Sequence, residues 1–225
     1  MAKVFIGVGH GGNDPGASKY LIEKDINLIM ALACRDYLEK NGVQVLMSRT
    51  SDENDSLSDE INECNAFKPD LAIDIHNNAG GGDGFEAYYH YKGGASKALA
   101  LNIEDEIKAI GQNSRGVKTK LNSSGKDYFG FIRQTLCPAV IVEGCFVDNQ
   151  TDIQIANTEE KQRNFGFAYA RGILTTLGID PGENNQVKPE KTIYKVQIGA
   201  YSLMENAQKQ LEKAKKAGFS DAYIA

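Results

Sequence analysis

The sequence predicts an α/β fold: a mainly parallel, twisted sheet with helices on both faces, followed by a linker and a partial βαβ-type module. Two observations predict it. Short apolar runs alternate with longer amphipathic segments over residues 1–179, and this alternation is typical of parallel sheets covered by helices. The runs are apolar at nearly every position, as in strands that are buried on both faces.

The predicted elements follow in chain order. The first strand, residues 4–8, leads into a glycine-rich loop, and the helix after it begins near Glu23 and ends at Asn41-Gly42, a typical helix stop. Further strands are predicted at 43–47, 71–75, 85–91, 129–133 and 139–143, and further helices at 56–67, 96–110 and 159–177. The polar residues 111–127 are predicted as a connection between elements.

The composition changes at residue 180. Residues 180–191, DPGENNQVKPEK, contain one apolar side chain and are predicted to form a linker. Residues 192–225 then show a strand, a charged amphipathic helix and the start of a second strand. Because one strand and one helix bury too little surface for a core of their own, we expect the sequence to end inside a second domain.

Composition restricts the classes of function. With 225 residues, 41% hydrophobic and 24% charged, the chain is typical of a soluble globular protein, and its net charge of −5 gives no general attraction to nucleic acid or anionic lipid. No apolar run is long enough to insert into a membrane, and the first ten residues show no signal peptide, so synthesis in the cytoplasm is expected. Four scattered cysteines predict free thiols. The oligomeric state stays open.

Three of the four candidate site residues end predicted strands. These are His10, His76 and Glu143, while Glu23 opens the first helix just beyond the glycine-rich loop. Because open α/β sheets bind ligands at the carboxyl ends of their strands, we expect these side chains to lie together. Two histidines and one carboxylate suit a catalytic Zn²⁺ ion with an open position for water. A second carboxylate is then needed as a general base, and Glu143 is the candidate.

Each residue also has a structural interpretation. A lone histidine after a strand is often a hydrogen-bonded loop residue, and a glutamate in a first helical turn complements the helix dipole. The combination of four such groups favours the site, whereas His90 lacks partners and is interpreted as structural. Asp14 either caps the Asp-Pro-Gly turn or accepts the second N–H of a histidine, and Asp74 shares the strand face of His76.

Several segments together resemble one enzyme family. GHGGNDPGA, the Glu-Lys-Asp that follows it, RTSDENDSLSDEINECNAFKPDLAIDIHNN, RGVKTK, FIRQT and PAVIVEGCFVDN occur in the order seen in the zinc-dependent N-acetylmuramoyl-L-alanine amidases of the amidase type 3 family. The resemblance covers residues 1 to about 178. It implies one Zn²⁺ per catalytic domain, bacterial peptidoglycan as the partner, and cleavage of the amide bond between N-acetylmuramic acid and L-alanine.

The resemblance also implies roles for single residues. The family's zinc ligands fall on His10, Glu23 and His76, and its catalytic glutamate falls on Glu143. A group with motif positions near the cleft is expected either to bind muropeptide or to brace loops: Asn77, Asn78 and Arg133. The chain departs from the family pattern at Cys145, where a glycine is usual, and this raises the alternative of a cysteine nucleophile paired with a histidine.

The C-terminal segment has a resemblance of its own. Residues 194–224 resemble the first half of a sporulation-related repeat (SPOR) domain, which implies binding to glycan strands of the wall. Together the two resemblances imply an amidase that lyses the cell wall. It is expected to be either a lysin that is released late in sporulation or a prophage endolysin that depends on a holin. Two alternatives remain: an inactive wall-binding protein, and another zinc hydrolase on the same fold.

Overall fold

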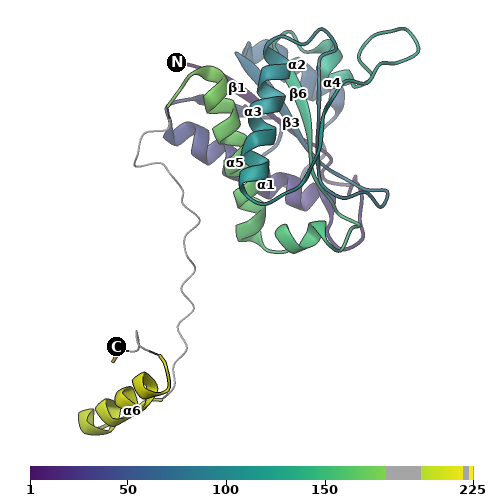
Figure 1. The fold of residues 1–225 in the computed structure, drawn as a ribbon. Helices are drawn as coiled ribbons and strands as arrows, with labels where there is room; N and C mark the ends of the chain where they lie inside the picture. Colours follow the sequence, from purple (N-terminus) through teal and green to yellow (C-terminus); the bar gives the residue numbers. More distant parts are fainter. Residues whose placement is uncertain (181–198, 220–222, 225) are drawn as a thin grey trace. The chain divides into compact units, whose positions relative to one another are not determined.

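The computed structural model describes residues 1–180, 199–219 and 223–224 (Figure 1). The chain divides into two compact units, Met1–Val187 and Lys188–Ala225. The predicted linker at 180–191 lies almost wholly outside the described residues, and the domain boundaries stay a prediction. Within the described part, no helix has the length and apolarity needed to cross a membrane.

The first unit is built on one six-stranded sheet with the strand order β2-β1-β3-β6-β4-β5. Neighbouring strands are parallel except β4 and β6, which run antiparallel. The mainly parallel sheet that the alternation of elements predicts is thus confirmed. The strands are β1 (Lys3–Val8), β2 (Gln44–Met47), β3 (Leu71–Asn78), β4 (Phe85–Tyr89), β5 (Ser114–Lys118) and β6 (Ala139–Phe146).

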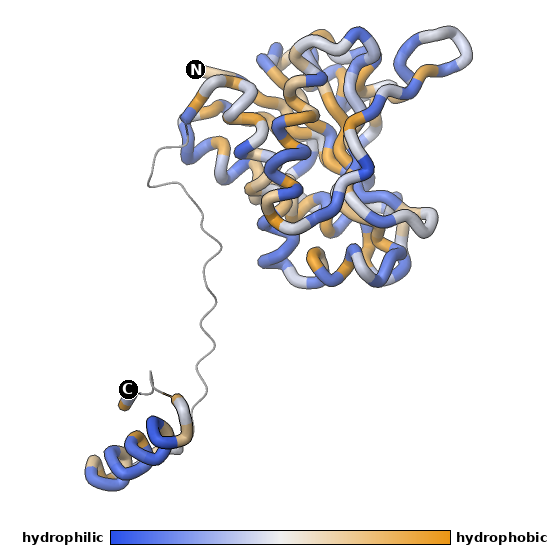
Figure 2. The backbone as a smooth tube through the Cα atoms, viewed as in Figure 1, coloured by the Kyte–Doolittle hydropathy of each residue, from blue (hydrophilic) through white to orange (hydrophobic). Residues whose placement is uncertain are grey.

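Helices cover both faces of this sheet. The larger core lies on one face, where α1, α3 and α5 pack against alternate residues of the strands. A smaller core lies on the other face, beneath α2 and α4. Hydrophobic residues accordingly gather in the interior of this unit (Figure 2). The helices are α1 (Glu23–Lys40), α2 (Leu57–Phe67), α3 (Ala95–Ala109), α4 (Gly130–Gln134) and α5 (Glu159–Leu177), with a short 3₁₀ helix η1 (Asp152–Ile155) after β6.

Local sequence sets the ends of two helices. Helix α2 begins after Ser56, whose hydroxyl accepts a hydrogen bond from the backbone N–H of Asp59. Helix α5 begins in the same way after Thr158 and ends at Gly178, which adopts a left-handed conformation with φ 68°. These caps satisfy backbone groups that the helix itself leaves without partners.

Five of the predicted segments differ clearly from the structure. Residues 129–133, predicted as a strand, mostly form helix α4, because a short apolar run does not separate the two states. Strand β5 lies in the predicted polar connection; it is an edge strand with little apolar patterning. Strands β3 and β6 continue beyond 75 and 143, and β4 ends at Tyr89 rather than 91.

The second unit contains the predicted amphipathic helix, α6 (Met204–Lys216). Its side chains are mostly exposed and its surface is mainly hydrophilic (Figure 2). The two strands predicted around this helix fall largely on residues outside the described part of the chain.

Close packing between α1 and α5 gives a test of the fold. A Cβ atom at Gly166 would lie 2.1 Å from the backbone oxygen of Met30 and 2.8 Å from Cβ of Ala33. In an open helix Gly→Ala is stabilising. Here we expect Gly166→Ala to lower the free energy of unfolding by about 1–3 kcal/mol, because the helices must separate. Urea unfolding measures this. The exposed Thr175→Ala on the same helix is the control, and a stabilised Gly166→Ala would contradict the packing.

Candidate active site

His10 lies in the loop after β1 and is held by its neighbours. Its backbone is left-handed, with φ 63°. Nδ1 of His10 lies 2.8 Å from Oδ2 of Asp14, while the other oxygen of Asp14 accepts a hydrogen bond from the N–H of Gly16. Asp14 therefore has both of the roles considered above: it closes the turn and it orients the imidazole. With Nδ1 engaged, Nε2 faces Glu23 at 3.2 Å.

Glu23 is the first residue of α1 and its carboxylate is buried, with 4% of the residue exposed. Oε2 accepts a hydrogen bond from the N–H of Ala17, and Oε1 accepts one from the N–H of Asn77. Burial alone raises the pKa of Glu23, but hydrogen bonds from His10 and His76 outweigh it and hold the pKa well below its ordinary range. Glu23 is therefore ionised at neutral pH.

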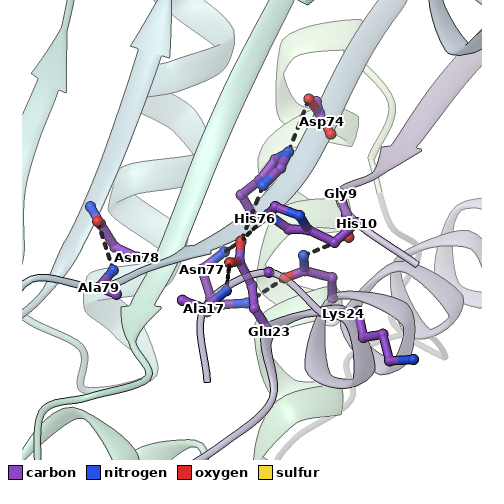
Figure 3. Close-up of polar contacts among 12 residues, drawn as sticks. Gly9, His10, Ala17, Glu23, Lys24, Asp74, His76, Asn77, Asn78 and Ala79 are labelled. Atoms are coloured by element: carbon purple, nitrogen blue, oxygen red, sulfur yellow. Dashed lines mark hydrogen bonds and ion pairs between the residues drawn. The ribbon is translucent and has the colours of Figure 1, made fainter. Parts of the chain in front are cut away.

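His76 completes the cluster from β3 (Figure 3). Its Nδ1 lies 3.1 Å from Oε1 of Glu23, and its Nε2 lies 3.4 Å from Oδ2 of Asp74. The two imidazole rings meet edge to face, with centroids 5.0 Å apart. A Cβ at Gly9 would lie 2.2 Å from the His76 ring, so only glycine leaves room for it.

These three side chains fit a metal ion. Among the described residues they form the only cluster of three or more potential ligand side chains, and the ligand atoms of His10, Glu23 and His76 all lie within 4.8 Å of one another. The remaining nitrogen of each imidazole faces a carboxylate, from Asp14 or Asp74, which is the usual outer partner of a metal-bound histidine. Two nitrogens and one oxygen leave a position open, as in catalytic zinc sites.

Two buried side chains, Arg49 and Asn27, also hold the loop that carries His10, and the sequence analysis did not identify them. Arg49 is 2% exposed and donates hydrogen bonds to the backbone oxygens of Val8, Gly9 and Lys24. Asn27 donates a further bond to the oxygen of Gly9. These bonds join the end of β1 to the start of α1, and so set the distance between His10 and Glu23.

Glu143 lies inside β6, in register with His76 of β3 on one side and with Glu86 of β4 on the other. The prediction that His76 and Glu143 end their strands is therefore imprecise, although both lie in the last part of the strand. Burial raises the pKa of Glu143 to about 7; His76 opposes this rise, and the neighbouring carboxylates add to it. A carboxylate with this pKa exchanges protons readily at neutral pH.

Strand β6 changes register directly after Glu143. Between His76 and Asn78 of β3, β6 contains one residue more, and this irregularity turns Cys145 toward the larger core. The thiol is fully buried, and burial raises its pKa. Its Sγ and its backbone N–H both bond Oδ1 of Asn77. A buried thiol with a raised pKa on the opposite face does not support the cysteine-nucleophile alternative.

The three predicted substrate contacts have the following positions. Asn77 is 2% exposed and its amide nitrogen donates to Oδ1 of Asn27, while its backbone holds Glu23. Asn78 is partly buried and its side chain accepts a bond from the N–H of Ala79. Arg133 is exposed and donates to two backbone oxygens of the preceding loop. Their contacts within the chain are those of bracing residues, and substrate binding by them stays a prediction.

A pair of buried carboxylates lies next to the site: Asp74, which the sequence already offered as a partner of His76, and Glu60, which was not predicted. Glu60 and Asp74 are 7% and 3% exposed, and Oε1 of Glu60 and Oδ1 of Asp74 have no hydrogen-bond partner among the described residues. Both oxygens lie over Gly7 of β1, where a Cβ would come within 1.8 Å and 2.9 Å of them. Burial, and then the charge of Asp74, raise the pKa of Glu60 well above its usual range.

This raised pKa predicts the pH dependence of stability. The folded state keeps the Glu60 proton above pH 4.5, where the unfolded state loses it, so the stability that Glu60 contributes falls as pH rises. Glu60→Gln does not titrate. In zinc-free protein, its free energy of unfolding relative to wild type should therefore increase between pH 5 and pH 8, by at most about 1.4 kcal/mol per pH unit. Urea unfolding measures the difference, with the exposed Glu39→Gln as control. Parallel pH curves would refute the assignment.

Comparisons with known proteins identify the family. The family model for N-acetylmuramoyl-L-alanine amidase matches residues 4–175, and that for the SPOR domain matches residues 171–225. The sporulation-specific N-acetylmuramoyl-L-alanine amidase of Bacillus subtilis is 37% identical over 229 residues, which cover 100% of this chain and 85% of the relative. The endolysin of Bacillus phage SPP1 is 33% identical over 186 residues, with coverage of 78% and 66%.

A solved structure shows the same fold. The catalytic domain of CwlV, an N-acetylmuramoyl-L-alanine amidase from Bacillus (Paenibacillus) polymyxa, aligns with a TM-score of 0.72 and 29% identity, covering 80% of this chain and all of that domain. Fold and matches together define a peptidoglycan amidase. The chain belongs to the N-acetylmuramoyl-L-alanine amidase family, and the family and enzyme type predicted from its motifs are confirmed.

Proposed function

We propose that this amidase uses a zinc ion held by His10, Glu23 and His76 to hydrolyse the amide bond between N-acetylmuramic acid and L-alanine in peptidoglycan. The observation that carries the proposal is the convergence of these three ligand atoms within 4.8 Å, next to a fourth, separate carboxylate. When bound, zinc supplies a Lewis acid for the scissile carbonyl and lowers the pKa of a water molecule.

The protein's own groups carry the proton. Glu143, with a pKa raised to about 7, accepts a proton from the attacking water and donates it to the leaving alanine nitrogen. Because burial raises the pKa of Glu143 to about 7, its protonated and ionised forms have similar populations at neutral pH. Asp14 and Asp74 act through the histidines: each accepts an N–H from one ring and fixes which nitrogen faces the metal.

The setting in the cell is proposed from the relatives. The similarity to the sporulation-specific amidase extends over the whole chain, including the second unit, whereas that to the phage endolysin covers 78%. The SPOR match supports binding of wall glycan by the second unit. We therefore favour a wall-lysing amidase of sporulation over a prophage endolysin.

The role of Glu143 is tested by Glu143→Gln, which keeps the shape and removes the base. Activity on purified cell walls, followed as release of alanine amino termini, should fall about 10²- to 10⁴-fold while zinc content is unchanged. The exposed Glu159→Gln is the matched control and should remain fully active. Retained activity in Glu143→Gln would show that another group transfers the proton.

The metal site is tested by Glu23→Gln, paired with Asp25→Asn, an exposed acid in the same helical turn. Glu23→Gln should lower zinc affinity more than about 10-fold, and Asp25→Asn should leave it unchanged. Chelation should abolish wild-type activity and added Zn²⁺ should restore it. Metal content measures the first effect. Equal zinc binding in both variants would exclude Glu23 as a ligand.

Product analysis separates the alternatives. New alanine amino termini without new reducing ends identify the amidase reaction. Loss of acetyl groups, or cleavage inside the peptide, would indicate another zinc hydrolase. Binding to walls and to zinc without any product would indicate an inactive wall-binding protein.

A further inference from the structure

Charged side chains on the catalytic face of the sheet are separated by sign. His76, Glu143 and Glu86 lie in register on three adjacent strands, β3, β6 and β4. They form a row across the sheet that begins at the proposed metal ligands and passes through the proposed base. Acidic side chains predominate beyond its β3 end, whereas two basic side chains, Arg115 and Lys118, lie beyond its β4 end.

The end near β1 is acidic. A hollow of about 270 Å³ is lined by four acidic side chains and by His10 and His76 of the proposed metal site, and its remaining lining residues are uncharged. Two of the carboxylates, Glu60 and Asp74, have an oxygen without a hydrogen-bond partner among the described residues. Among the described residues that line it there is no lysine or arginine, so this end offers a substrate carboxylate no long basic side chain. The lining carboxylates are Asp14, Asp55, Glu60 and Asp74.

The other end, at β5, is basic. Nε of Arg115 and Nζ of Lys118 both contact a single oxygen of Glu86, Oε1, the second at 2.7 Å. The other oxygen of Glu86 already accepts a bond from the hydroxyl of Tyr88. Two cations thus share one carboxylate, and their side chains remain 44% and 35% exposed. Arg115 also lies over the ring of Phe146, which fixes its position.

The geometry points to Arg115 and Lys118 as an anion subsite, which binds a free carboxylate on the peptide side of the scissile amide. This inference rests on the proposed function. Strands lie about 4.8 Å apart, so β5 is about 10 Å from the strand of Glu143. An extended peptide covers about 3.3 Å per residue, so a carboxylate on the second or third residue of the stem reaches the two cations.

The charge separation also sets the direction of the substrate. If the anionic peptide binds at β5, the uncharged glycan lies on the other side of the scissile bond, toward the acidic hollow. The reverse orientation would place the peptide carboxylates at a hollow whose described lining contains no lysine or arginine. The proposed specificity is therefore for a free carboxylate, rather than a carboxamide, on a stem residue close to the cleaved bond.

The test uses the full chain loaded with zinc and two synthetic muramoyl peptides, which differ in one group: the second stem residue has a free carboxylate or its carboxamide. For Arg115→Gln and Lys118→Gln we expect kcat/KM on the carboxylate substrate to fall roughly tenfold or more, mainly through KM. On the carboxamide substrate, the change should be less than about threefold. Lys120→Gln is the matched control, because Lys120 contacts the ring of Tyr128 and not Glu86.

Each outcome has a distinct meaning. Equal losses on both substrates would show that the two cations only neutralise Glu86, and would overturn the subsite. A wild-type enzyme that cleaves both peptides without preferring the carboxylate would also overturn it, while leaving the proposed function intact. A wild type that cleaves neither peptide, nor cell walls, would refute the proposed function itself. Thermal unfolding of each variant separates lost binding from lost folding.

Discussion

The buried carboxylate of Glu23 is the constraint on which the site depends. It faces both histidines and accepts hydrogen bonds from the backbone of Ala17 and Asn77, so it joins the first loop, the first helix and the third strand. A buried carboxylate is costly unless it has partners. The partners of Glu23 include His10 and His76, the other two side chains of the proposed metal site. The contacts that stabilise the buried charge of Glu23 therefore also bring these three side chains together.

The sheet provides the rest of the geometry. Because His76, Glu143 and Glu86 are in register, the spacing between the proposed metal ligand, the proposed base and the neighbouring acid is set by backbone hydrogen bonds rather than by flexible loops. The irregularity after Glu143 then turns Cys145 into the core, where its backbone and thiol hold Asn77. One extra residue in β6 thus leaves Glu143 on the face of the proposed site and places Cys145 in the core on the other face.

Sequence reasoning recovered what depends on local pattern. The apolar runs, the helix periodicities and the family motifs predicted the sheet, most elements and the family. The polar edge strand β5 and the short helix α4 were missed because their apolar patterns are too brief to separate the states. Arg49, which holds the loop of His10, and the two carboxylates next to the site, Glu60 and Glu86, come from distant parts of the chain, and only the folded structure brings them to the site.

Strand β1 and the residue after it shape the site through two positions that have no side chain, Gly7 and Gly9. Its residues Val4, Ile6 and Val8 fill the larger core, whereas on the opposite face Phe5 is followed by Gly7 and Gly9. The space over these two glycines is occupied by groups from elsewhere, the Glu60 carboxylate and the His76 ring. Alternate residues of one short segment therefore have two functions. The larger side chains pack into the core on one face, and the glycines leave room on the other face for the Glu60 carboxylate and the His76 ring.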